Sequence, residues 1–214
     1  MMRWLSWLAT TLVLFSGGVV FWQATDGFAA FTTETARRLE IARSPRPLPT
    51  AALLDPHGSE IRARDLAGRV LIVDFIYTAC PAVCSQLGGT FGTLQRELND
   101  ELRHDRVKLL SVAFDLERDT PAALAHYRRS HRAGTDWIVA RTPSEQARAA
   151  WFRAFGVIAI PDGLGGFTHN ATLNVVDARG RLVAVFDVEQ WPAALELART
   201  LAQRELPFHA LALR

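Results

Sequence analysis

Apolar blocks and amphipathic stretches alternate along most of the chain, and this alternation predicts strands and helices in turn. Aliphatic and aromatic residues fill 69–78 and 107–115 without a period, as is typical of strands buried on both faces. Between them, 84–102 carries its apolar side chains at helical spacing and is predicted to be an amphipathic helix. A Thr-Pro pair begins a second predicted helix at 120–132. This order indicates parallel strands joined through helices.

The pattern changes toward the C-terminus. A strand is expected at 137–141, and a helix runs from a capping box at 142–145 to Gly156. Two apolar strands around a short turn at 172–187 predict an antiparallel hairpin, and a helix follows at 192–204. A parallel βαβ unit followed by a ββα hairpin is the thioredoxin-like arrangement. The expected fold class is therefore α/β, with a thioredoxin-like central mixed sheet flanked by helices.

The N-terminus carries a separate apolar segment. Residues 4–22 are without charge, close to the roughly 20 residues that a helix needs to cross a membrane. Tryptophans stand at both ends of this run, where indole rings prefer the membrane interface: Trp4, Trp7 and Trp22. We expect a membrane anchor at 1–25, with a signal-like, cleaved segment as the alternative. A connector at 26–46, rich in proline toward its end, leads to the folded domain at 47–214.

The basic residue Arg3 indicates that the short N-terminal tail is cytoplasmic. A single span then places the domain on the other side of the membrane. The expected location is the inner (cytoplasmic) membrane, with one pass and the soluble domain facing the periplasm.

Charge and cysteine content narrow the possible functions. The chain has 214 residues, with 24 basic and 22 acidic side chains and a net charge of +2, so it lacks the excess of positive charge typical of nucleic-acid binding. DNA and RNA are therefore not expected as partners. With only 2 cysteines, a disulfide scaffold, a four-cysteine zinc site and a cysteine-ligated iron–sulfur cluster are excluded.

The two cysteines, Cys80 and Cys84, stand at the junction between a predicted strand and a predicted helix. A helix N-terminus favours the thiolate form. Residues i and i+4 lie about 5–6 Å apart on a helix, a separation that suits both a disulfide and two sulfurs on one metal ion. Two thiolates and one imidazole would suit Cu(I), whereas thiol redox catalysis usually employs a C-x-x-C spacing. A purely structural pair is the third possibility.

Six histidines could complete such a site. Five stand in a turn, on predicted helices or in the C-terminal tail, where solvated side chains are expected: His57, His104, His126, His131 and His209. His169 follows a glycine-rich stretch at 161–166 and precedes the predicted hairpin. In a thioredoxin-like fold the start of this hairpin lies beside the cysteine loop. We therefore expect His169 within reach of both sulfurs, on a mobile loop.

Three motifs together resemble the Sco/SenC family of copper chaperones. The stretch 74–84, DFIYTACPAVC, is similar to the family's F-x-Y-T-x-C-P-x-V-C signature. The stretch 114–121, FDLERDTP, is similar to its D-P-E-R-D-T-P signature. Thr168-His169-Asn170, followed by a strand and a turn, is similar to its histidine region. The resemblance covers about residues 47–205, and the family's membrane tether matches the apolar N-terminus.

The resemblance implies a function and a ligand set. Cys80, Cys84 and His169 would bind copper as Cu(I), with Cu(II) as a second state, and Asp115 would support the site. The chaperone would deliver copper to a cytochrome c oxidase subunit and receive it from a copper-donating periplasmic protein, without being an enzyme. Ala82 replaces the Asp common between the cysteines, and Leu116 replaces the family's Pro. The absence of a carboxylate at Ala82 would change the affinity for Cu(II) or the reduction potential of the thiols.

Two enzymatic alternatives remain open at this stage. The cysteine pair could act as a thiol-disulfide oxidoreductase that reduces the cysteines of the oxidase copper site. Thr78, Pro81 and Cys84 also superficially resemble the T-x-x-C pattern of a peroxiredoxin-like peroxidase.

Overall fold

The computed structural model describes residues 2–25, 27, 32–80, 83–163 and 165–204. The chain divides into two compact units, Met1–Arg43 and Ser44–Arg214.

The N-terminal unit consists of two helices, α1 (Met2–Ala24) and α2 (Thr33–Arg43). Apolar side chains along α1 are exposed, among them Trp4, Leu12, Leu14, Phe15 and Trp22. Across the described residues, no helix combines the length and the apolar character needed to cross a membrane. In α2, Glu34 accepts hydrogen bonds from the guanidinium groups of Arg37 and Arg38, and these bonds lower the pKa of its carboxyl despite the opposing effect of burial.

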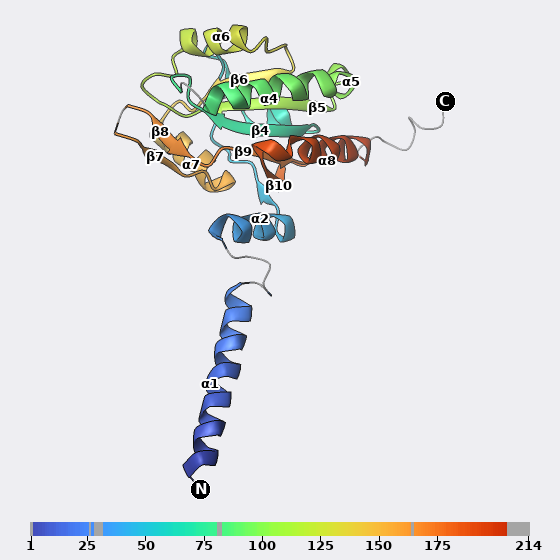
Figure 1. The fold of residues 1–214 in the computed structure, drawn as a ribbon. Coiled ribbons are helices and arrows are strands. Elements are labelled where there is room, and N and C mark those ends of the chain that lie inside the picture. Colours follow the sequence, from blue (N-terminus) through green and yellow to red (C-terminus); the bar gives the residue numbers. More distant parts are fainter. Residues whose placement is uncertain (1, 26, 28–31, 81–82, 164, 205–214) are drawn as a thin grey trace, which may run out of the picture. The chain divides into compact units, whose positions relative to one another are not determined.

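The larger unit is built on one mixed sheet (Figure 1). Its strand order is β1-β10-β9-β4-β5-β6-β2-β3, with β4, β5 and β6 parallel and the other pairings antiparallel. The strands are β1 (Arg46–Pro47), β2 (Leu53–Leu54), β3 (Glu60–Ile61), β4 (Val70–Ile76), β5 (Val107–Ala113), β6 (Trp137–Arg141), β9 (Thr172–Val176) and β10 (Arg181–Asp187). This arrangement confirms the mixed α/β sheet.

Helices cover the sheet on both sides. They are α3 (Ala63–Leu66), α4 (Val83–Glu97), α5 (Asn99–Arg103), α6 (Pro121–Ser130), α7 (Glu145–Phe155) and α8 (Trp191–Arg204), with a short 3-10 turn at Val188–Gln190. The ring of Phe75 on β4 packs against Phe152 and Phe155 of α7. On the opposite side, Trp137 of β6 packs against Phe91 of α4. The central strand β4 is buried along its whole length, as its sequence, apolar except for Asp74, predicts.

Two helix boundaries differ from the sequence expectation. The predicted helix at 84–102 ends at Glu97, and a second helix begins at Asn99, because Leu98 leaves helical geometry just before Asn-Asp, a pair with low helix propensity. In α7 the N-cap is Ser144, whose hydroxyl accepts a hydrogen bond from the Ala147 N–H at 3.2 Å. Thr142 instead turns its hydroxyl inward to the carbonyl of Ala113. The predicted Gly156 end is confirmed, with a left-handed backbone at φ 66°.

A buried acid lies in the middle of the sheet. Asp74 on β4 is paired in register with Ser111 on β5, on the side that faces α4, and it is 0% exposed. Among the described residues, neither of its carboxyl oxygens has a hydrogen-bond partner. Burial raises the pKa of Asp74 to about 7.

This buried carboxyl makes the stability of the fold depend on pH. The unfolded chain releases the Asp74 proton near the ordinary pKa of 3.8, whereas the folded chain keeps it up to about 7. The free energy of unfolding therefore falls between those values, by about 4 kcal/mol in total. We expect the free energy of unfolding of Asp74→Asn, relative to that of the wild-type protein, to rise progressively from pH 4 to pH 7. Guanidinium unfolding measures this difference. Glu189→Gln, at an exposed carboxyl, is the control, and parallel pH profiles for wild type and Asp74→Asn would contradict the expectation.

Candidate metal centre

The cysteine loop connects the end of β4 to the start of α4. After Ile76 the chain passes through Tyr77 and Thr78, and the N–H of Cys80 donates to the Tyr77 carbonyl at 3.1 Å. Cys80 is half-buried. The backbone of Cys84 lies in the first turn of α4, while its side chain is outside the described residues, as are Pro81 and Ala82. The strand-to-helix junction expected for the two cysteines is confirmed.

A carboxylate that the sequence analysis did not single out clamps this loop. Asp119 is 3% exposed, and its Oδ1 accepts hydrogen bonds from both the N–H and the hydroxyl of Thr78, each at 2.7 Å. Its Oδ2 accepts from the N–H of Asp115 at 2.8 Å. Burial raises the pKa of Asp119, against the opposing effect of the Thr78 hydrogen bonds. One side chain thus joins the chain segments that leave β4 and β5.

The side chain of Asp115, the predicted supporting residue, contacts residues of its own loop. It is 4% exposed, and its carboxylate pairs with the guanidinium of Arg118 and accepts from the N–H of Glu117. Both partners belong to its own loop. The direct contact with the cysteine loop comes from Asp119. The only sequence signal for this role was an acidic residue in the motif at 114–121, and which of its carboxylates faces the loop depends on the tertiary fold.

His169 lies on strand β8 (Phe167–His169), which pairs with β7 (Ala159–Pro161) in a separate two-stranded sheet. Its ring packs edge-on against Tyr77 and Phe114, with centroids 6.1 and 5.3 Å away. Both ring nitrogens are buried and have no hydrogen-bond partner among the described residues. Burial lowers the pKa of His169, which favours the neutral imidazole. A neutral ring with an unused lone pair is the form that binds metal ions.

The structure differs from the expected loop at His169, because the histidine is on the paired strand β8. The turn is closed by Asp162, which accepts from the Gly166 N–H at 2.8 Å and donates its own N–H to the Gly166 carbonyl. The glycines supply the positive φ that the turn requires, 75° at Gly163 and 87° at Gly165. The sequence analysis missed the hairpin because each of its strands has only three residues.

Contacts hold this hairpin beside the cysteine loop (Figure 1). The hydroxyl of Tyr77 donates to the Phe167 carbonyl at 3.2 Å, and the Arg118 guanidinium lies over the Phe167 ring at 5.9 Å. The structure therefore brings His169 against Tyr77, three residues before Cys80. Among the described side chains, which do not include that of Cys84, no three metal-binding groups gather around one point.

The other histidines lie elsewhere. His57, His104 and His126 are exposed, as expected, and His209 is outside the described residues. His131 differs from the expectation, because its ring packs on Tyr127 with centroids 4.4 Å apart and burial lowers its pKa.

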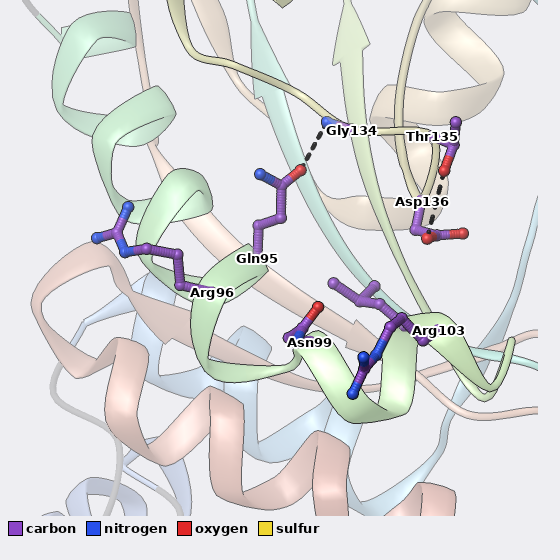
Figure 2. Close-up of a pocket in the computed structure, with 8 residues that line it drawn as sticks. Gln95, Arg96, Asn99, Arg103, Gly134, Thr135 and Asp136 are labelled. Atoms are coloured by element: carbon purple, nitrogen blue, oxygen red, sulfur yellow. Dashed lines mark hydrogen bonds between the residues drawn. The ribbon is translucent and has the colours of Figure 1, made fainter.

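Hollows in the surface lie both beside this centre and away from it. One of about 610 Å³ is lined by the Asp115–Arg118 loop and by Gly163, Gly165 and Phe167 of the hairpin. Another, of about 380 Å³, lies at the far end of α4 from the cysteines, around Gln95, Arg96 and Asn99 (Figure 2). A helix rises 1.5 Å per residue, so the second hollow is about 15 Å or more from the cysteine loop.

The fold is a thioredoxin-like domain in which two cysteines follow the end of β4 and a buried histidine packs on Tyr77 beside them. A family model described as SCO1/SenC matches residues 50–203. The chain belongs to the SCO1/SenC family.

Individual relatives agree with this assignment. A Stutzerimonas stutzeri protein, named as a candidate copper-binding protein, is 28% identical over 145 residues, which cover 64% of this chain and 67% of that protein. The copper-bound structure of Bradyrhizobium japonicum ScoI has a TM-score of 0.58 and 25% identity, covering 72% of this chain and 98% of that one. A SCO1/SenC family lipoprotein of Bacillus anthracis shares the fold with a TM-score of 0.67 at 20% identity, covering 75% and 98%.

The clamp at Asp119 can be tested by substitution. Asp119→Ala leaves the Thr78 and Asp115 donors without their acceptor, and the unfolding free energy should fall by about 2–4 kcal/mol. The Thr78 amide should exchange its hydrogen much faster, as measured by mass spectrometry of a peptide spanning 77–80. Asp177→Ala is the matched control, because Asp177 is an equally buried turn carboxylate that accepts from the Arg179 and Arg181 amides. It should destabilise the protein without altering exchange at Thr78. Equal protection of Thr78 in both variants would contradict a clamp.

Proposed function

We propose that the protein is a copper chaperone that holds Cu(I) through Cys80, Cys84 and His169 and delivers it to the copper centre of cytochrome c oxidase. The observation that carries the proposal is the buried imidazole of His169, whose nitrogens have no protein partner in the described structure although it packs beside the cysteine loop. A buried polar group without a partner costs about 1–3 kcal/mol unless something binds it. A metal ion would remove that penalty.

The donor set suits copper as cargo. Thiolate sulfur is a soft ligand that selects Cu(I), and a neutral imidazole completes a three-coordinate site, whereas zinc normally takes four ligands. The backbone of Cys84 lies in the first turn of α4, and the helix dipole would stabilise a thiolate formed there. Cu(II) is a second state to consider, although Ala82 leaves no carboxylate between the cysteines.

Asp115 and Asp119 have supporting parts in this proposal. Asp119 keeps the Thr78 end of the cysteine loop in place. Asp115 holds Arg118, which lies over Phe167 two residues before His169. Neither carboxylate needs to touch the metal.

The client is inferred from relatives. A Bacillus subtilis relative, at 24% identity, is named as an SCO1 homologue, and another solved relative is titled as a member of the Sco family of cytochrome c oxidase assembly proteins. By this likeness we propose that the receiving partner is an oxidase subunit; a copper-donating periplasmic protein stays a prediction of the sequence analysis.

Copper binding is directly testable. In an anaerobic Cu(I) titration of the reduced full chain, we expect one copper per chain with two sulfur ligands and one nitrogen ligand by X-ray absorption. His169→Ala should lose the nitrogen ligand and weaken Cu(I) binding by at least about tenfold, because a ligand is removed. Cys80→Ser and Cys84→Ser should lose tight binding. His126→Ala, at an exposed histidine on α6, is the control and should bind as wild type. Unchanged affinity in His169→Ala would refute the ligand set.

The same cysteines support a competing function, a thiol-disulfide oxidoreductase. In that reaction the two thiols pass two electrons and two protons to a disulfide of the client, which becomes a dithiol while Cys80 and Cys84 become a disulfide. The half-buried Cys80 beside a helix start favours such exchange. If metal-free protein reduced a model disulfide rapidly and His169→Ala did so equally well, while copper bound weakly, this function would replace the chaperone.

We also propose that residues 1–25 anchor the protein in the inner membrane, that 26–46 form a connector, and that the domain at 47–214 works in the periplasm. The uncharged run at 4–22 and the exposed apolar side chains of α1 support this division. The Bacillus anthracis relative is described as a lipoprotein, a class of membrane-attached proteins.

Membrane attachment can be tested by fractionation. The full chain should sediment with the membranes and resist alkaline carbonate, because a spanning helix is held by its apolar surface and not by charge. Deletion of residues 1–25 should abolish sedimentation. Release of the full chain by carbonate would contradict a spanning anchor.

A further inference from the structure

A hollow of about 420 Å³ lies between the β2–β3 turn and the C-terminal end of α6. Three of its lining side chains are cations of one short segment: Arg128, Arg129 and Arg132. His57 of the β2–β3 turn lines the same hollow, and the remaining lining residues are uncharged. Arg128 is half-buried, and the other two arginines are exposed. The hollow therefore has positive charge and no acidic wall.

Several other arginines of the larger unit are paired with carboxylates: Arg62 with Glu60, Arg64 with Asp65, Arg69 with Asp105, Arg106 with Asp100, Arg118 with Asp115, Arg148 with Glu145, Arg181 with Asp177 and Arg199 with Glu101. Within the described part of the chain, Arg128, Arg129 and Arg132 form no ion pair. What sets these three apart is that they line one hollow together. The helix dipole favours basic residues in the last turn, but it does not require three of them around one hollow.

The backbone at Arg132 is held in a left-handed conformation, with φ 54°. Helices usually place glycine at this position after their end, because other residues are strained there. Gln95 of α4 fixes the turn, since its amide nitrogen donates to the Arg132 carbonyl at 3.1 Å and its oxygen accepts from the Gly134 N–H at 2.7 Å (Figure 2). Arg132 therefore occupies a position where glycine would be less strained, and the hydrogen bonds of Gln95 hold the backbone of this turn in place.

The hollow of Figure 2, which is lined by Gly134 of the same turn, differs in the charged residues that line it. It also holds two arginines, Arg96 and Arg103, but its wall includes the carboxylate of Asp136. Arg96 donates to the Thr93 hydroxyl at 2.9 Å, and Asp136 pairs with Lys108. That hollow therefore has a carboxylate in its wall, whereas the lining of the hollow beside His57 has none.

We propose that the hollow formed by Arg128, Arg129, Arg132 and His57 binds a phosphate group. Guanidinium groups present planar forks of donors that match phosphate oxygens, and two or more around one hollow neutralise the charge of a phosphate. The volume suits a phosphate headgroup or a small phosphorylated molecule. The ligand is either the phosphate of an anionic lipid or a soluble phosphate compound. This site is separate from the cysteine loop and does not depend on copper binding.

In the test, the full chain in nanodiscs is treated with phenylglyoxal, a reagent that modifies arginine. The rate of modification of each arginine is measured by mass spectrometry. One arm adds pyrophosphate to nanodiscs of phosphatidylcholine, and the other replaces part of that lipid with phosphatidylglycerol. Either ligand should slow modification of Arg128, Arg129 and Arg132 by about five- to tenfold, since a bound anion shields the guanidinium groups. Arg96 and Arg103 in the same sample are internal controls and should react at an unchanged rate.

Calorimetric titration with pyrophosphate provides a second measurement. The triple variant Arg128→Gln, Arg129→Gln, Arg132→Gln should bind at least about tenfold more weakly, and the double variant Arg96→Gln, Arg103→Gln should bind as wild type. Protection by phosphatidylglycerol alone would identify a membrane lipid as the source, and protection by pyrophosphate alone would identify a soluble ligand. Absence of protection in both arms, equal protection of Arg96 and Arg103, or unchanged binding by the triple variant would overturn the proposal.

Discussion

The candidate centre depends on one buried carboxylate, Asp119. Its two oxygens accept three hydrogen bonds, two from Thr78 and one from the Asp115 N–H. These donors belong to the segments that leave the neighbouring parallel strands β4 and β5, whose ends meet at the same edge of the sheet. Without an acceptor, the buried donors would each cost free energy, so the carboxylate determines the path of both segments. The loop that carries Cys80 and the loop that carries Asp115 therefore behave as one unit.

The hairpin that carries His169 is attached to this unit by different forces. The Tyr77 hydroxyl and the Arg118 guanidinium both reach Phe167, and the rings of Tyr77 and Phe114 enclose the imidazole. Aromatic contacts bury the ring but leave its nitrogens without hydrogen bonds. That arrangement is unfavourable for stability alone, and it is the arrangement expected of a ligand kept ready for a metal ion. Asp74, buried without a partner in the same sheet, is a second place where the fold accepts an energetic cost.

The ionic contacts of the larger unit differ from place to place. Beside the cysteine loop, Asp115 is paired with Arg118, while Asp119 accepts hydrogen bonds from the backbone. Several surface arginines are likewise paired with acids. Among the described residues, Arg128, Arg129 and Arg132 at the end of α6 form no ion pair and line one hollow, where a bound anion would balance their charge.

The sequence by itself determined most of the strands and helices and the kinds of side chain at the candidate site. Mainly apolar runs without a period identified β4 and β5, helical spacing identified α4, and the hairpin β9–β10 followed from its turn, because these signals are local. The motifs around Cys80 and His169 indicated the family, and the SCO1/SenC match agrees. Only the tertiary structure decided that Asp119 holds the cysteine loop and that His169 stands on a short strand between two aromatic rings. These outcomes depend on contacts between residues far apart in the chain, and neither hydrophobic periodicity nor composition records which carboxylate or ring will meet which partner.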